Sequence, residues 1–144
     1  MKDHPLYKIL IGKNYSFGQF LQWAMSSKYQ GLKNELNNGQ IRRVSGYLSL
    51  NKDNIRDAFI IACKNANSKN SIVGVTDKYS EYLKILFKKG ILIDDTELKI
   101  NKSLRNDKDF NLTESQEALL DDLTKWDYLF YQHCALVFNS YKLK

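Results

Sequence analysis

Apolar residues recur every three or four positions in several stretches of the chain, which is the spacing of one face of an α-helix. The first stretch predicts a helix over about 16–26, because Ser16 and Gln19 form a capping-box pattern at its start. A second helix is expected over about 53–66, with Asp53 as its N-cap. Its apolar face carries Ile55, Ala58, Phe59, Ala62 and Cys63.

Two further helices follow. The third is expected to start at Thr76 or Asp77, and Gly90 occupies the position just past its end, where glycine is favoured. The fourth is expected over about 114–141, preceded by Thr113 and a second capping-box pattern. Its apolar stripe includes Leu120, Leu123, Phe130, Cys134, Val137 and Tyr141, with Asp127 in the middle. We expect Asp127 to be at least half buried and to accept hydrogen bonds, because an unpaired buried carboxylate is costly.

One stretch predicts a β-strand. Residues 71–76 read Ser-Ile-Val-Gly-Val-Thr, an apolar run without alternating charges, which is typical of a strand buried on both faces. A strand needs partners, and the weaker candidates are residues 8–11 and 91–94, or a segment outside this chain. The expected fold class is therefore α/β, mostly helical, with a small and mainly parallel sheet. Residues 27–50, with three glycines, are expected to be a long loop with one turn of helix.

Length and charge narrow the class of protein. The chain has 144 residues, which fits a single domain over 1–144 and is too short for an α/β barrel. Lysine and arginine exceed aspartate and glutamate by 22 to 16, so the net charge is +6. A positive surplus favours an anionic partner. No apolar run approaches the about 18 residues of a membrane span, so we expect a cytoplasmic protein.

The sequence gives little support for a metal site, a phosphate loop or a catalytic histidine. Cys63 and Cys134 fall on apolar helix faces and are expected to be buried thiols in a reducing compartment, and no Cys/His cluster predicts a metal site. Gly12-Lys13 follows an apolar run but lacks the remaining residues of a phosphate loop. His4 and His133 assemble with no nucleophile, so the catalytic residues stay unknown.

Two polar stretches have the composition of anion-binding loops. Residues 38–46 contain Arg42 and Arg43 between glycines, and residues 101–108 contain an arginine, two lysines, a hydroxyl and amides. Guanidinium, ammonium and hydroxyl groups all bind phosphate and sulfate oxygens. The alternative is that both stretches are solvated basic loops.

The order of these motifs resembles the C-terminal half of the sulfotransferase family that includes heparan sulfate 2-O-sulfotransferases and bacterial glycan sulfotransferases. The family's N-x-Q-T-R-x-x-x-G segment is similar to Asn38, Gln40, Arg42 and Gly46. Its V-G-V/L-T-E strand and following helix are similar to 73–87, with Asp77 in place of the glutamate. Its final helix, N-x-x-D-x-x-L-Y-x-x-A-x-x-x-F, is similar to Asp127, Phe130, Tyr131, Ala135 and Phe138.

The resemblance implies a P-loop-like fold with 3′-phosphoadenosine 5′-phosphosulfate as the sulfuryl donor and a glycan or other hydroxyl compound as acceptor. By that resemblance the donor-binding residues are Lys102, Ser103, Arg105 and Lys108, and Asn38, Gln40 and Arg42 are structural or substrate-side residues. The family's phosphosulfate loop and catalytic base lie in an N-terminal half, so the chain is expected to be truncated or split.

The alternative from the residues themselves is a small basic helical binding or scaffold module for an anionic partner. Nucleic acid is the less favoured partner, because most aromatic residues lie on the helix stripes instead of alternating with basic residues.

Overall fold

The computed structural model describes residues 13, 15–93 and 111–141, and this part of the chain is mostly helical. It contains six α-helices and one short 3-10 helix, η1. In chain order these are α2 (Phe17–Ser26), α3 (Gln30–Leu36), α4 (Gly39–Ser45), α5 (Ile55–Ala66), η1 (Thr76–Lys78), α6 (Tyr79–Lys88) and α7 (Glu114–Ser140).

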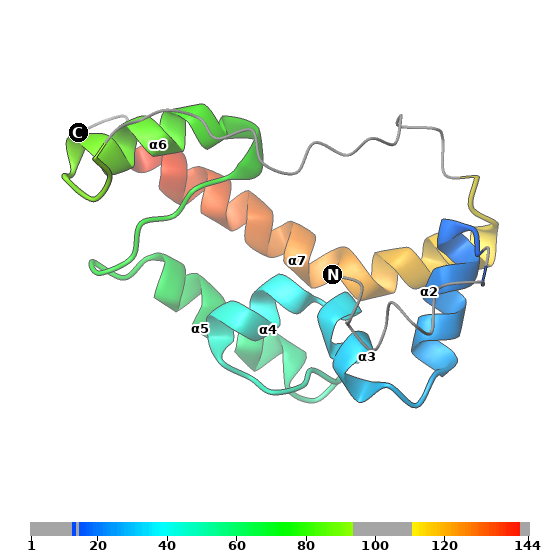
Figure 1. Ribbon diagram of the computed structural model, residues 1–144. Helices are drawn as coiled ribbons and strands as arrows, with labels where there is room; N and C mark the ends of the chain where they lie inside the picture. Colours follow the sequence, from blue (N-terminus) through cyan, green and yellow to red (C-terminus); the bar gives the residue numbers. More distant parts are fainter. Residues whose placement is uncertain (1–12, 14, 94–110, 142–144) are drawn as a thin grey trace.

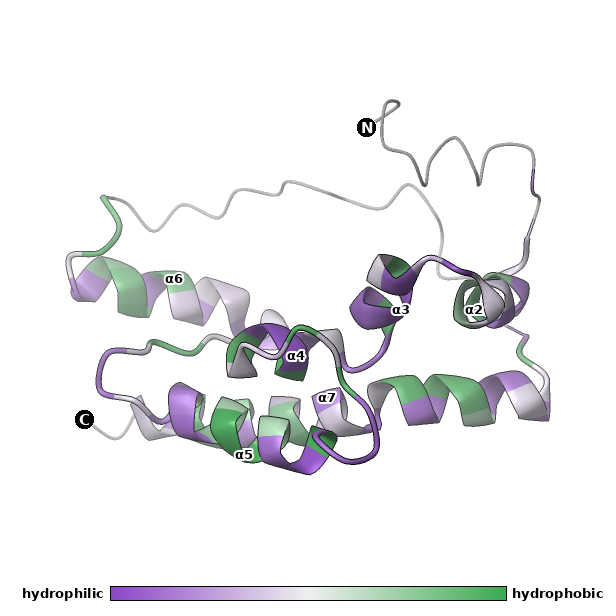
Figure 2. Ribbon diagram, turned by 90° about the horizontal axis from the view of Figure 1, so that it is seen from below, coloured by the Kyte–Doolittle hydropathy of each residue, from purple (hydrophilic) through white to green (hydrophobic). Residues whose placement is uncertain are grey.

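The long helix α7 is the element on which the others assemble (Figure 1). Helices α2, α4 and α5 all contact it, and α4 and α5 also pack closely against each other. Figure 2 shows polar and apolar residues mixed along α7. Its buried apolar residues, Leu123, Phe130, Cys134 and Phe138, recur at steps of seven and four and so lie on one face of the helix, whereas Leu129 and Leu136 are exposed.

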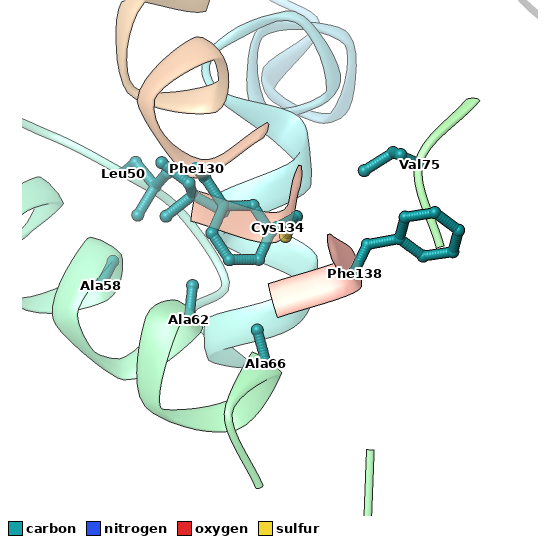
Figure 3. Packing of buried hydrophobic residues seen from close by; sticks show 9 residues of the cluster. Leu50, Ala58, Ala62, Ala66, Val75, Phe130, Cys134 and Phe138 are labelled. Atoms are coloured by element: carbon teal, nitrogen blue, oxygen red, sulfur yellow. The ribbon is translucent and has the colours of Figure 1, made fainter. Parts of the chain in front are cut away.

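The main core lies where α4, α5 and the second half of α7 meet. Three alanines on one face of α5, Ala58, Ala62 and Ala66, are buried there and point toward the large side chains of α7 (Figure 3). Because alanine is small, α7 can approach α5 closely; Phe130 lies over these alanines, whereas the ring of Phe138 points toward Val75, just before η1 (Figure 3). Burial of a side chain such as Phe138, which is fully enclosed, stabilises the fold by about 1.5–3 kcal/mol.

The local helix signals are largely confirmed. Both capping boxes form: Ser16 with Gln19 at the start of α2, and Thr113 with Gln116 at the start of α7. Gly90 has a φ of +69°, the left-handed conformation expected just past the end of α6.

The start of α5 differs from the prediction. Asn54, and not Asp53, is the N-cap residue. The side-chain oxygen of Asn51 accepts hydrogen bonds from the backbone N–H groups of Asp53 and Asn54, at 2.9 and 3.0 Å. A turn closed by this asparagine therefore precedes the helix, and Asp53 lies within that turn.

The long loop predicted over 27–50 is wrong, because two short helices, α3 and α4, occupy most of it. A seven-residue helix is marginal alone and forms when tertiary contacts stabilise it. For α4 the stabilising groups come from α7, as described below. The local sequence of residues 27–50 does not show that α7 provides these groups.

The strand predicted over 71–76 is also wrong for the part of the chain described here, which contains no β-strand. The mainly parallel sheet is therefore not shown. Val75 is buried and has extended dihedral angles, φ −120° and ψ 142°. The N–H of Val73 donates to the hydroxyl of Tyr141 at 3.2 Å. Val75 thus has the extended backbone that β-branched residues favour. Residues 71–75 have no neighbouring strand among the described residues, since 91–93 form none, and 8–11 lie outside the described part of the chain.

Gly74 gives a test of how tightly this extended segment is packed. A Cβ at Gly74 would lie 2.5 Å from Cγ of Tyr82, so alanine forces the ring or the segment to move. We expect Gly74→Ala to lower the free energy of unfolding by about 1–3 kcal/mol in urea denaturation. Gly31→Ala in α3 is the matched control, because no atom lies within 4 Å of its added Cβ, and it should be neutral or stabilising. Equal effects of the two changes would contradict the packing described here.

Candidate functional site

Asn38, a residue of the first polar motif, lies between α3 and α4 and is fully buried. Its backbone is left-handed, with φ 47° and ψ 50°. Asparagine adopts this conformation more readily than other residues with a side chain, apart from aspartate and histidine. The position therefore combines an unusual backbone with a side chain that must find hydrogen-bond partners inside the protein.

Those partners are backbone groups in the middle of α7. The N–H of Asn38 donates to the carbonyl of Leu123 at 2.7 Å, and its Nδ2 donates to the carbonyl of Asp122 at 3.3 Å. Its Oδ1 accepts from the N–H groups of Trp126 and Asp127, at 2.8 and 3.0 Å. In a regular α-helix these two N–H groups would bond to those two carbonyls. Asn38 therefore sits across two successive rungs of the helix ladder.

This insertion explains the shape of α7, which changes direction part of the way along its length (Figure 1). A side chain that enters the i to i−4 ladder is an established cause of helix bending. Because Asn38 supplies both donors and acceptors, the helix bends without leaving these backbone groups unpaired.

Asp127 completes the connection in the opposite direction. Its carboxylate accepts hydrogen bonds from the backbone N–H groups of Gln40 and Ile41, at 3.0 and 2.8 Å. These are the second and third residues of α4, whose N–H groups have no partner within the helix. Asp127 is partly buried, so the expectation of a half-buried, hydrogen-bonded carboxylate is confirmed. We refer to these six hydrogen bonds between α7 and the start of α4 as the Asn38–Asp127 bridge.

The arginines of the first polar stretch are already paired. Arg42 Nε donates to the carbonyl of Asn34 at 3.0 Å, and its Nη2 lies 2.5 Å from Glu35 Oε1. Arg43 forms an ion pair with the other oxygen of Glu35. The Arg42 side chain is only 16% exposed. The predicted anion-binding loop thus has its two guanidinium groups bound to one carboxylate, whereas Gln40 is exposed.

The donor-binding residues implied by the resemblance, Lys102, Ser103, Arg105 and Lys108, lie outside the described residues. So do His4 and Gly12. Lys13 is described: its Nζ is 3.2 Å from the hydroxyl of Tyr15 and lies over the rings of Tyr15 and Trp23, 5.5 and 5.8 Å from their centroids. This lysine contacts aromatic rings as a cation–π group.

A contact that the sequence did not predict joins Tyr131 on α7 to Asp77 in η1. The tyrosine hydroxyl donates to the aspartate carboxylate. This hydrogen bond, followed by burial and the negative charge of Asp77, raises the pKa of Tyr131, so the phenol stays protonated and acts as a donor. Both residues belong to motifs that carry the resemblance.

The remaining candidate groups are poorly suited to catalysis. Burial, with a smaller effect of nearby Cys63, raises the pKa of Cys134 to about 11, and burial also raises that of Cys63. Both thiols are therefore protonated at neutral pH, which disfavours a nucleophilic role. His133 Nε2 lies 3.1 Å from Asn67 Nδ2, which makes Nε2 an acceptor. No group of three or more metal-ligating side chains occurs within the described residues.

Comparisons with protein-family models, with curated proteins and with solved structures found no match to this chain. Among the helices of the described residues, none combines the length and the apolar character that crossing a membrane requires.

Removal of the Asn38 side chain tests its role in α7. Glycine tolerates the left-handed backbone, so Asn38→Gly isolates the loss of the side-chain bonds and removes the Asn38 acceptor from two part-buried N–H groups. We expect the free energy of unfolding to fall by about 2–4 kcal/mol, measured by chemical denaturation. Asn70→Gly, in an exposed turn, is the control and should change stability by no more than about 0.5 kcal/mol.

Asp127 is tested separately through its effect on α4. Asp127→Ala removes the acceptor for two N–H groups at the helix start and a favourable charge there, so we expect a loss of about 1–2 kcal/mol in unfolding free energy. Asp121→Ala, an exposed carboxylate on the same helix, is the control. If the two variants were equally stable, the carboxylate of Asp127 would not be holding α4.

Proposed function

We propose that this chain is a relative of the glycan sulfotransferases and that it binds the donor nucleotide 3′-phosphoadenosine 5′-phosphosulfate. The observation that supports this proposal is that residues from the three motifs behind the resemblance contact one another. Asn38 and Asp127 form reciprocal hydrogen bonds between α4 and α7, and Asp77 accepts from Tyr131.

These contacts join positions far apart in the sequence. Gln40 and Asp127 are 87 positions apart, and Asp77 and Tyr131 are 54 apart. Motifs that match by accident have no physical reason to meet, whereas motifs that define a fold are expected to make its long-range contacts. The spatial meeting of the motifs therefore favours kinship over a chance match of short patterns.

The contacts also divide the motif residues by role. Asn38 has all its polar atoms engaged within the chain, and Arg42 is bound to Glu35, so we assign both to the scaffold. We assign the contacts with the donor nucleotide to Lys102, Ser103, Arg105 and Lys108. These residues place three cations and a hydroxyl group within seven positions of the sequence. Phosphate and sulfate oxygens accept charge-assisted hydrogen bonds from such groups.

The extended segment 71–75 fits the same proposal. Its sequence is apolar, Val75 is buried and has the dihedral angles of a strand, and the segment lies against α6 through Gly74 and Tyr82. We assign it to the sheet of a P-loop-like fold, where a strand outside the described residues would pair with it.

The proposal covers binding of the donor and leaves the catalytic residues unassigned. Transfer of a sulfuryl group to a hydroxyl acceptor requires a base for the acceptor proton and cations on the sulfonate oxygens. Residues 102–108 supply cations. The acceptor class, a glycan or another hydroxyl compound, rests on the resemblance alone.

Calorimetric titration with 3′-phosphoadenosine 5′-phosphate tests the proposal. Two charge-assisted bonds, with about 4 kcal/mol of binding free energy in total, correspond to a Kd of about 1 mM. We expect binding in this range, weakened by added salt. Arg105→Ala should weaken it beyond detection, and Lys13→Ala, a lysine already in contact with aromatic rings, should leave it unchanged.

A short DNA duplex added as competitor separates this proposal from the alternative of a basic helical binding module. If the duplex binds more tightly than the nucleotide, or if Arg105→Ala and Lys13→Ala bind the nucleotide equally, the chain acts as a general anion-binding module and the donor site is wrong.

A further inference from the structure

A pocket of about 400 Å³ lies between the end of α2, the loop before α5 and the middle of α7. Its apolar surface includes Ile55, Leu119, Leu123 and Trp126, and Lys52 and Lys125 also line it. This volume falls in the range of small-molecule sites, which combine an apolar surface with a few polar groups.

The apolar surface has a fixed position. Leu119, Leu123 and Trp126 recur at the spacing of one helix face, so they form a continuous strip of α7. The ring of Trp126 packs against Phe59 of α5, with 5.4 Å between the ring centroids. The backbone beneath Trp126 is held by Asn38, whose Oδ1 accepts from its N–H.

The wall opposite α7 is held by asparagines. Asn37 Nδ2 donates to the carbonyl of Leu50 at 3.2 Å, and Asn54 Nδ2 donates to the carbonyl of Ser49 at 3.1 Å. Asn51, which lines the pocket with Asn37, closes the turn before α5 through its Oδ1. These bonds hold the wall of the pocket in place, so little ordering entropy opposes binding.

The charges at the pocket favour an anion. Lys52 and Lys125 are exposed, and neither forms an ion pair with any described residue. The one carboxylate that lines the pocket among the described residues is Asp122, which leaves a surplus of one positive charge. A flat apolar group against Trp126 with an anionic group near the lysines would satisfy both parts of the lining.

We propose that this pocket binds a small amphipathic anion: an aromatic body seated on Leu119, Leu123 and Trp126, with a sulfonate, sulfate or carboxylate held by Lys52 and Lys125. None of these pocket residues belongs to the 101–108 stretch. A negative result at this pocket therefore leaves the proposed donor site standing, and a negative result at the donor site leaves the pocket standing.

The test is a titration of the full chain with 2-naphthalenesulfonate, followed by ¹H–¹⁵N NMR. The chain has two tryptophans, and Trp23 does not line the pocket. We expect the indole N–H signal of Trp126 to shift saturably and that of Trp23 to stay in place. The cation 2-naphthyltrimethylammonium, with the same aromatic body, should bind at least about tenfold more weakly.

The variant Lys52→Gln/Lys125→Gln should weaken binding of the sulfonate about tenfold and leave the weak binding of the cation unchanged or improved. Lys64→Gln/Lys84→Gln, two exposed lysines that do not line the pocket, is the matched control and should bind as the original chain does. Equal affinity for the two naphthalene compounds, equal loss in both lysine pairs, or shifts of both indole signals would overturn the proposal.

Discussion

A single asparagine that bonds to the middle of α7 fixes how α4 meets this long helix. Asn38 satisfies two carbonyls and two N–H groups of that helix, and Asp127 returns two hydrogen bonds to the start of α4. With α4 fixed against the middle of α7, the alanine face of α5 packs against both, with Phe130 of α7 over the alanines and Phe138 against Val75 (Figure 3). The polar bridge thus sets the geometry, and apolar burial supplies most of the stabilisation.

The sequence predicted those features whose causes are local. Ser16 with Gln19 and Thr113 with Gln116 are three positions apart, so their capping boxes can be seen in the sequence, and both form. The start of α4 could not be predicted in this way, because its N–H groups are capped by Asp127 from 86 and 87 positions away. The strand prediction failed for a related reason: β-branched residues at 71–75 favour an extended backbone, but a strand also needs a second segment beside it.

The candidate site was predicted in part. Asp127 interrupts an apolar stripe, which predicts a buried and hydrogen-bonded carboxylate. The burial of Asn38 follows the same rule, but its partners on α7 are too far away in the sequence to be predicted. The cations Arg42 and Arg43 predicted an anion-binding loop, whereas Glu35, seven and eight positions earlier, pairs with both and neutralises much of their charge. The pocket beside Trp126 was not predicted, because its walls come from four separate parts of the chain.

The insertion of Asn38 also bears on the order of events during synthesis. Its partners on α7 lie 84 to 89 positions later in the sequence. In a nascent chain that has not yet been extended to Asp122, Asn38 therefore has none of these partners. The isolated α7 segment, for its part, can close its own ladder as a straight helix. Docking adds hydrogen bonds from Asn38 to the carbonyl and N–H groups of this stretch, so we expect the bend in α7 to arise when the two halves of the chain meet. Such distant contacts require closure of a long loop, which makes their formation a late step in folding.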